Sequence, residues 1–100
     1  MARRFHDEAE MESDEANEYY SEQSLEVGFA FVAALEEAVT LCEEWPLAAP
    51  IWPGRPDVRR RVLVDFPYSI IYAPEPSGIF VVAVAHAKRR PGYWVGRLRR

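Results

Sequence analysis

A dense group of prolines near the middle of the chain most strongly limits what it can fold into. Four prolines and one glycine lie in the segment from Trp45 to Pro56. Each proline fixes its own φ angle and lacks a backbone N–H, so a helix or a central strand cannot continue through such a group. The sequence therefore predicts an extended surface loop here, with separate structures before and after it.

The residues before this loop repeat with the period of a helix. A first helix is expected from His6 to Gln23. Ser24 precedes Leu25 and is suited to cap a second helix, which should end before Pro46. Two antiparallel helices joined by a short turn are therefore expected. Their predicted apolar faces contain Ala9, Ala16, Tyr19 and Tyr20 in the first helix, and Phe29, Phe31, Val32, Ala34, Leu35, Ala38, Val39 and Cys42 in the second.

The residues after the loop change to a period near two, which is typical of strands. Strands are expected over residues 58–64, 68–72 and 79–85, with a hairpin connection over residues 73–78. Residues 3–5 are short enough to form an added edge strand, and residues 87–100 form a polar and aromatic tail. One hundred residues suit a single domain over residues 1–100. The predicted class is α+β, with a helical hairpin packed on one side of a small antiparallel sheet.

The charges divide between the two halves of the chain. The first fifty residues carry a formal charge of −11 and the last fifty one of +7, which together give the net −4. One interpretation is that the acidic helices are simply well solvated and that the two halves attract each other in the fold. The other is that the C-terminal half presents a cationic face to an anionic partner, either nucleic acid or an acidic protein segment.

The sequence also excludes several classes of protein. Its one cysteine, Cys42, excludes an internal disulfide and a cysteine-rich zinc site. The longest apolar run, residues 79–85, is far shorter than the about 20 residues that cross a bilayer. An acidic stretch follows Arg3 and Arg4, so no secretory signal is predicted and a cytoplasmic location is expected. Phosphate-binding and dinucleotide motifs are absent from the sequence, and no metal or cofactor is predicted.

Four stretches of the sequence match a known family in their order along the chain. These are "EANEYYSEQS" and "FVAALEEAVTLCEEWP" in the helical half, and "VRRRVLVDFPYSIIY" and "VVAVAHAKRRPGYWVGR" after the loop. Together they cover nearly the whole chain, and in this order they resemble the RelE/ParE superfamily of toxins from bacterial type II toxin-antitoxin modules, which includes plasmid stabilisation proteins. The resemblance implies a helical hairpin against a twisted antiparallel sheet, and a cognate antitoxin encoded beside the toxin.

Members of this superfamily differ in activity. RelE-like toxins cut messenger RNA on the ribosome, whereas ParE-like toxins act on DNA gyrase and are not nucleases. The cleaving members use basic residues on the sheet and near its last strand, with a Tyr or His near the C-terminus. The resemblance places Arg60 and Arg89 near the basic positions and Tyr93 near the aromatic one. Ser69 stands where the cleaving enzymes have an arginine, so one catalytic cation is missing.

Three functions follow from this resemblance. The preferred one is a toxin that inhibits growth by a ParE-like action on DNA gyrase and is neutralised by its antitoxin. The alternative is a RelE-like, ribosome-dependent endoribonuclease, whose catalytic residues would be Arg60, His86, Arg89 and Tyr93. The third is a decayed, non-toxic module that only binds a partner. The missing cation favours the first of these over the second.

Individual residues of the basic half also have two interpretations. Arg60 should face away from Arg59 and Arg61, because successive side chains of a strand point to opposite faces. His86 is expected on the same face as Phe80, Val82 and Val84, either as a structural residue or as a proton donor and acceptor. Tyr93 and Trp94 could instead close the core while Arg97 pairs with helix carboxylates. The predicted partner-binding residues are Arg60, Lys88, Arg89, Arg90 and Trp94.

Overall fold

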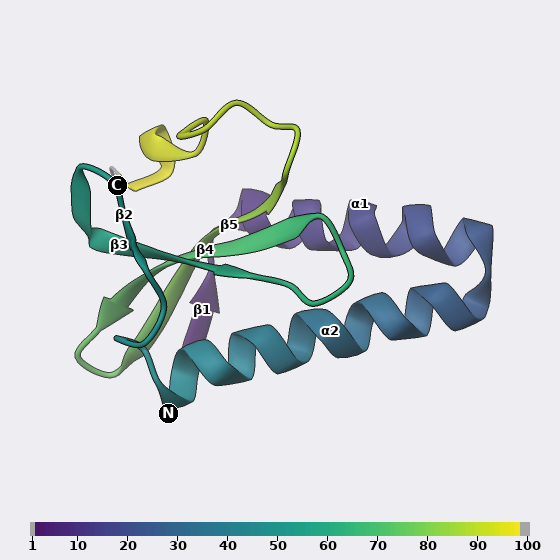
Figure 1. Ribbon diagram of the computed structural model, residues 1–100, viewed down its shortest axis with the longest axis horizontal. Coiled ribbons are helices and arrows are strands. Elements are labelled where there is room, and N and C mark those ends of the chain that lie inside the picture. The colour runs from purple at the N-terminus through teal and green to yellow at the C-terminus, as the bar shows by residue number, and fades with distance from the viewer. Residues whose placement is uncertain (1, 99–100) are drawn as a thin grey trace.

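The computed structural model describes residues 2–98 and contains two helices and a five-stranded sheet (Figure 1). The helices pack on one face of the sheet and the C-terminal tail packs on the other, which confirms the predicted α+β class. The last two residues of the predicted tail lie outside the described residues. In chain order the elements are β1 (Arg3–Phe5), α1 (Asp7–Gln23), α2 (Leu25–Glu44), β2 (Ile51–Trp52), β3 (Arg55–Val62), β4 (Tyr68–Glu75), β5 (Gly78–His86) and a final 3-10 turn (Val95–Leu98).

The strands lie in the order β1-β5-β4-β3-β2. The pairs formed by β2, β3, β4 and β5 are antiparallel, and β1 runs parallel to β5 at the edge of the sheet. The predicted edge strand at residues 3–5 is therefore confirmed, but the sheet is mixed and not purely antiparallel. Parallel neighbours need a long connection, and here all the elements between β1 and β5 supply it.

The two helices form a tight hairpin around Ser24. The backbone N–H of Ser24 donates to Tyr20 at the end of α1, and its hydroxyl accepts from the Val27 N–H at the start of α2, at 3.0 Å. The predicted cap is confirmed. Gly28 of α2 lies close against Ser21 of α1, since a Cβ atom added at Gly28 would come within 2.2 Å of the Ser21 hydroxyl. Neither helix in the described part of the chain could span a membrane.

The helical face of the sheet holds the larger core. Buried residues from α1 and α2 pack there against alternate residues of β4 and β5, as the helical period predicts. The prediction was wrong for Tyr19 on α1, which is 59% exposed, and for Phe29 and Val32 on α2, which are 72% and 44% exposed. Their positions on α2 point away from the sheet, because a helix in a two-layer fold covers the sheet with one side only. Leu35 packs at the border of this core and is partly buried.

The proline-rich segment is not entirely a loop. The short strand β2 lies within it, and β3 begins at Arg55, so Pro56 is part of a strand. Prolines are tolerated there because this side of the sheet is an edge, where a missing N–H breaks no central hydrogen bond. Arg59 fastens the preceding turn by donating to the carbonyl oxygens of Leu47 and Ala49, at 2.9 and 2.7 Å.

The hairpin between β4 and β5 is shorter than predicted, and β5 contains an irregularity. Strand β4 continues through Glu75, so only Pro76 and Ser77 connect it to β5. Opposite the step from Ile71 to Tyr72, the partner residue changes from Ala83 to Val81, so β5 has one extra residue there. Such a bulge reverses the alternation of faces along the strand.

Candidate functional site

The C-terminal tail folds back over the outer face of the sheet, the face without helices. The Trp94 side chain is 1% exposed and contacts the Trp52 ring edge to face, with the centroids 5.0 Å apart. It packs with Val58, Phe80 and other buried residues of the sheet. Trp94 therefore belongs to the core, and its predicted role as a partner-binding residue does not agree with this position. The packing of the two tryptophan rings against each other is typical of a structural role for Trp94.

One carboxylate, that of Glu12 on α1, holds the tail in place. It accepts hydrogen bonds from the Tyr93 hydroxyl at 2.6 Å and from the Val84 backbone N–H at 3.0 Å. It also pairs with the Arg97 guanidinium, at 2.9 and 3.1 Å. The side chains of Glu12 and Arg97 are 13% and 10% exposed, so the pair lies in a mostly dry environment. The predicted pairing of Arg97 with helix carboxylates is confirmed, and Glu8 is a second partner at 3.2 Å.

Glu12 itself was missed by the sequence analysis, although a signal was present. It lies between Ala9 and Ala16, three residues after one and four before the other, and both alanines are buried. A carboxylate on the buried side of an amphipathic helix needs partners, because an unpaired buried charge is costly. The position of Glu12 on the buried side of α1 therefore indicates that a cationic side chain from elsewhere in the chain pairs with it.

The environment of Tyr93 changes its acidity. Burial raises the pKa of its hydroxyl, and the hydrogen bond to the Glu12 carboxylate raises it further. The guanidinium of Arg89 stacks on the Tyr93 ring, 3.8 Å from its centroid, and lies 4.0 Å from the Glu12 carboxylate. Tyr93 is therefore a neutral donor bound to an acid inside the protein, and Arg89 partly shields that acid from solvent.

All four predicted catalytic residues line one small cavity on the outer face. The cavity has a volume of about 90 Å³, and Trp52, Ser69 and Arg90 also line it. The fold thus brings together Arg60 from β3, His86 from the end of β5, and Arg89 and Tyr93 from the tail. Ser69, the departure from the cleaving enzymes, lies in the same wall.

His86 does not share a face with all the residues predicted. Phe80 and Val82 point to the outer core while Val84 points to the helical core, because the bulge in β5 reverses the alternation. The His86 ring contacts the Tyr68 ring edge to face, 4.9 Å between centroids. Its Nδ1 accepts from the Lys88 backbone N–H at 3.0 Å. The neutral imidazole therefore carries its proton on Nε2 and faces other groups as a donor.

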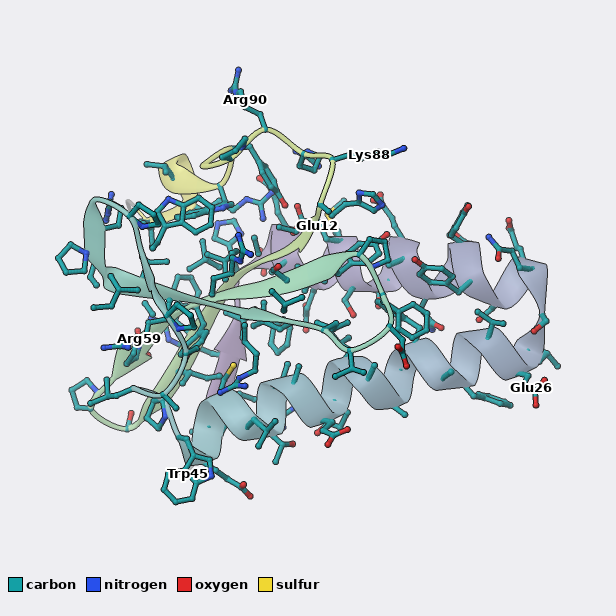
Figure 2. The ribbon with its side chains drawn as sticks, in the orientation of Figure 1. Glu12, Glu26, Trp45, Arg59, Lys88 and Arg90 are labelled. Atoms are coloured by element: carbon teal, nitrogen blue, oxygen red, sulfur yellow. The ribbon has the colours of Figure 1, made fainter. Side chains whose placement is uncertain are left out.

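Several cations around this cavity have no carboxylate partner within the described range. Arg60 is exposed, and its position opposite Ile71, an outer-core residue, confirms that it faces away from Arg59 and Arg61. Lys88 and Arg90 are exposed as well, and Figure 2 shows both side chains pointing away from the body of the protein. Residues 2–98 contain no group of three or more His, Cys, Asp or Glu side chains placed to hold a metal ion. The site can therefore bind anions through its cations.

Comparison with models of known protein families gives a match over most of the chain. The family model described as the ParE toxin of the type II toxin-antitoxin system parDE matches residues 3–91. The match begins at β1 and ends in the turn after the basic residues of the tail, so it includes both helices and the whole sheet. No curated protein matches the chain. The extent of the match shows that the chain belongs to the ParE toxin family of type II toxin-antitoxin systems.

Proposed function

We propose that this toxin inhibits growth by acting on DNA gyrase without cutting RNA, and that a cognate antitoxin neutralises it. The observation that carries the proposal is the 2.6 Å hydrogen bond from the Tyr93 hydroxyl to Glu12. A ribonuclease must take a proton from the ribose 2′-hydroxyl and give one to the leaving oxygen. Here the hydroxyl of Tyr93, the tyrosine that the resemblance places near the catalytic aromatic position, already donates its hydrogen bond to a carboxylate of the same chain.

The state of His86 supports the same proposal. A general base needs a ring nitrogen with a free lone pair that faces the substrate. The lone pair of Nδ1 accepts the Lys88 N–H, which leaves the protonated Nε2 toward other groups. Ser69 supplies no cation where the cleaving enzymes have one. A protein that only binds its target needs none of these proton transfers.

The unpaired cations fit a binding role. Arg60, Lys88 and Arg90 are exposed, Arg60 and Arg90 line the same cavity, and none of the three has a carboxylate partner among residues 2–98. Exposed cations grouped in this way attract an anionic surface over a distance of about 10 Å at moderate ionic strength. Gyrase and the ribosome both lie in the cytoplasm, so we propose that location for the toxin as well.

A ribosome-dependent endoribonuclease is the second candidate, and one observation favours it. Arg60, His86, Arg89 and Tyr93 line a single cavity although they come from three parts of the chain. Cations and a tyrosine around one small space could stabilise a phosphorane. This function would require Tyr93 to exchange Glu12 for the substrate, and His86 to release the Lys88 N–H.

Two assays of the protein and its Tyr93→Phe variant test the proposal, one with purified protein and one in cells induced to make it. We expect the toxin to inhibit gyrase supercoiling, and the variant to inhibit it equally, because binding transfers no proton. We expect primer extension on messenger RNA from induced cells to show no discrete cuts. Cuts at ribosome-positioned codons that fall about a hundredfold in Tyr93→Phe would establish the ribonuclease instead. Absence of both activities would favour the non-toxic, partner-binding module.

A further inference from the structure

A second cavity lies between α1, the start of β4 and the end of β5. It has a volume of about 250 Å³, and Tyr19, Tyr68 and Tyr93 line it together with Glu15. Figure 1 shows α1 running beside the end of β5, directly before the tail begins. His86 and Tyr93 line both this cavity and the one on the outer face, whereas Tyr19 and Tyr68 line only the cavity beside α1. The two cavities therefore meet at the base of the tail.

Contacts with neighbouring rings hold two of these tyrosines in place. The Tyr19 ring meets the Tyr20 ring edge to face, with the centroids 5.1 Å apart. The half-buried Tyr68 ring meets the rings of His86 and Tyr20 edge to face, at 4.9 and 6.3 Å between centroids. The aromatic wall of the cavity is therefore formed before a ligand binds. An aromatic ring attracts a cation over its face.

Glu15 supplies a negative charge to the same cavity. It is exposed and lies four residues before Tyr19, on the same side of α1. Burial raises the pKa of the Tyr68 hydroxyl most, and Glu15 is among the neighbouring groups that raise it further. The Glu15 carboxylate is therefore within electrostatic range of the Tyr68 hydroxyl. Across residues 2–98, no ion pair joins Glu15 to a cation.

The other charges at this cavity already have partners. Glu12 pairs with Arg97 at 2.9 Å. Arg89 stacks on the Tyr93 ring and lies 4.0 Å from the Glu12 carboxylate. Among the described residues that line the cavity, Glu15 thus carries the unpaired charge. The sequence has no Lys or Arg between Arg4 and Arg55, so α1 itself offers no cation to Glu15.

Elsewhere in the chain, a ring and a carboxylate together hold an arginine at two places. These groups are Arg4 with Phe80 and Glu75, and Arg89 with Tyr93 and Glu12. The guanidinium carbon lies 4.2 Å from the ring centroid in the first group and 3.8 Å in the second. Glu15 and Tyr19 form a third combination of carboxylate and ring, and here the chain supplies no arginine.

We propose that the cavity beside α1 binds an arginine side chain of another protein, whose guanidinium pairs with Glu15 and stacks on the Tyr19 ring. A guanidinium is planar, so it can lie on a ring and donate two hydrogen bonds to a carboxylate at the same time. The ammonium group of a lysine makes no such stacked, two-point contact. Glu15 and Tyr19 are both exposed, so a side chain from outside reaches them directly.

A capped glycine-arginine-glycine peptide tests this inference with the full-length, isotope-labelled protein. In nuclear magnetic resonance titrations we expect the amide signals of Glu15 and Tyr19 and the ring signals of Tyr68 to shift. The same peptide with citrulline in place of arginine is the matched control, because citrulline has nearly the same shape and no charge. It should cause no shift at these residues.

Two results of this titration would overturn the inference. The first is an equal effect of the arginine and citrulline peptides. The second is a shift at Glu37, an exposed acid of α2, as large as the shift at Glu15, since that would show general attraction to acidic helices.

Paired variants separate the charge from the ring. We expect Glu15→Gln to weaken binding of the arginine peptide about fivefold and Glu37→Gln, with the same net charge, to change it little. Tyr19→Leu removes the ring and should weaken binding about threefold, whereas Tyr19→Phe keeps the ring and should not. Tyr19 is 59% exposed, so both of its variants should fold, which circular dichroism checks. Equal affinities within either pair would contradict the proposed contacts.

Free arginine distinguishes a protein-borne side chain from the amino acid itself. Its carboxylate would face the carboxylates of Glu12 and Glu15, so we expect it to bind more weakly than the capped peptide. Tighter binding of free arginine would make this an amino-acid site and overturn the assignment to a protein partner.

Discussion

Tyr93 donates a hydrogen bond of 2.6 Å to Glu12, a residue 81 positions earlier in the chain. This contact joins the tail to the first turns of α1 and passes over the end of β5, where Glu12 also accepts the Val84 N–H. The dipolar charge pattern of the chain is thus used partly within the fold. Glu12 pairs with Arg97 and accepts the Tyr93 hydroxyl, while Arg60, Lys88 and Arg90 are exposed and have no carboxylate partner among residues 2–98. The first interpretation of the charge pattern, attraction within the fold, therefore applies to Glu12 and Arg97, and the second stays a prediction for the three unpaired cations.

The first prediction tests whether Glu12 holds the tail. Replacing Glu12 with Gln removes the negative charge that faces Arg97. The mostly buried guanidinium of Arg97 then keeps only its contacts with Glu8 and with the Val82 carbonyl oxygen as they are. We expect the free energy of unfolding to fall by about 1.5–3 kcal/mol, measured by urea denaturation. Glu10→Gln is the matched control, because Glu10 lies exposed on the same helix and should change stability by less than about 0.5 kcal/mol. Equal stability of the two variants would show that the tail is held by other contacts.

The second prediction compares two phenylalanines of α2. Phe31 is fully buried among the aromatic rings of Tyr20, Phe66 and Tyr68, whereas Phe29 is 72% exposed. Phe31→Ala should lower the free energy of unfolding by about 3–5 kcal/mol, since it leaves a cavity in the core. Phe29→Ala should stay within about 0.5 kcal/mol. Comparable losses in chemical denaturation would mean that the orientation of α2 described above is wrong.

Most of the fold could be predicted because its signals are local. The helical period, the Ser24 cap and the break before Pro46 depend on neighbouring residues, and the structure agrees with them. The near-period-two segments after the loop likewise became β3, β4 and β5. Arg60 could be separated from Arg59 and Arg61 from the geometry of a single strand.

The errors concern features that depend on contacts between distant parts of the chain. The parallel direction of β1 is set by its pairing with β5, and the bulge in β5 by its match to β4. Neither leaves a signal in the residues beside it. The side of α2 that meets the sheet was likewise ambiguous, because both Phe29 and Phe31 belong to a wide apolar stripe. The role of Glu12 required the tail to be placed first, and the sequence pattern alone did not place it.

The third prediction concerns the partner of the exposed cations. Charge reversal by Arg60→Glu should weaken the complex with the cognate antitoxin about tenfold and reduce its salt dependence, because Arg60 has no carboxylate partner among residues 2–98 to lose. Arg55→Glu is the control on the same strand, since Arg55 already pairs with Asp57 at 2.9 Å. Titration calorimetry at two salt concentrations measures both. If the two reversals have equal effects, only the total charge matters and Arg60 makes no specific contact.

The last prediction uses the acidity of Tyr93. Burial and the hydrogen bond to Glu12 raise the pKa of Tyr93 above the ordinary value of about 10. Since the fold favours the neutral hydroxyl, its contribution to stability is complete below pH about 10 and is lost as the pH rises toward the folded-state pKa. Burial also raises the pKa of Tyr72, to about 12, so Tyr93→Phe should remove only part of the alkaline fall in the free energy of unfolding. Urea denaturation at increasing pH measures the difference, and parallel curves for the wild type and Tyr93→Phe would refute the coupling between Tyr93 and Glu12.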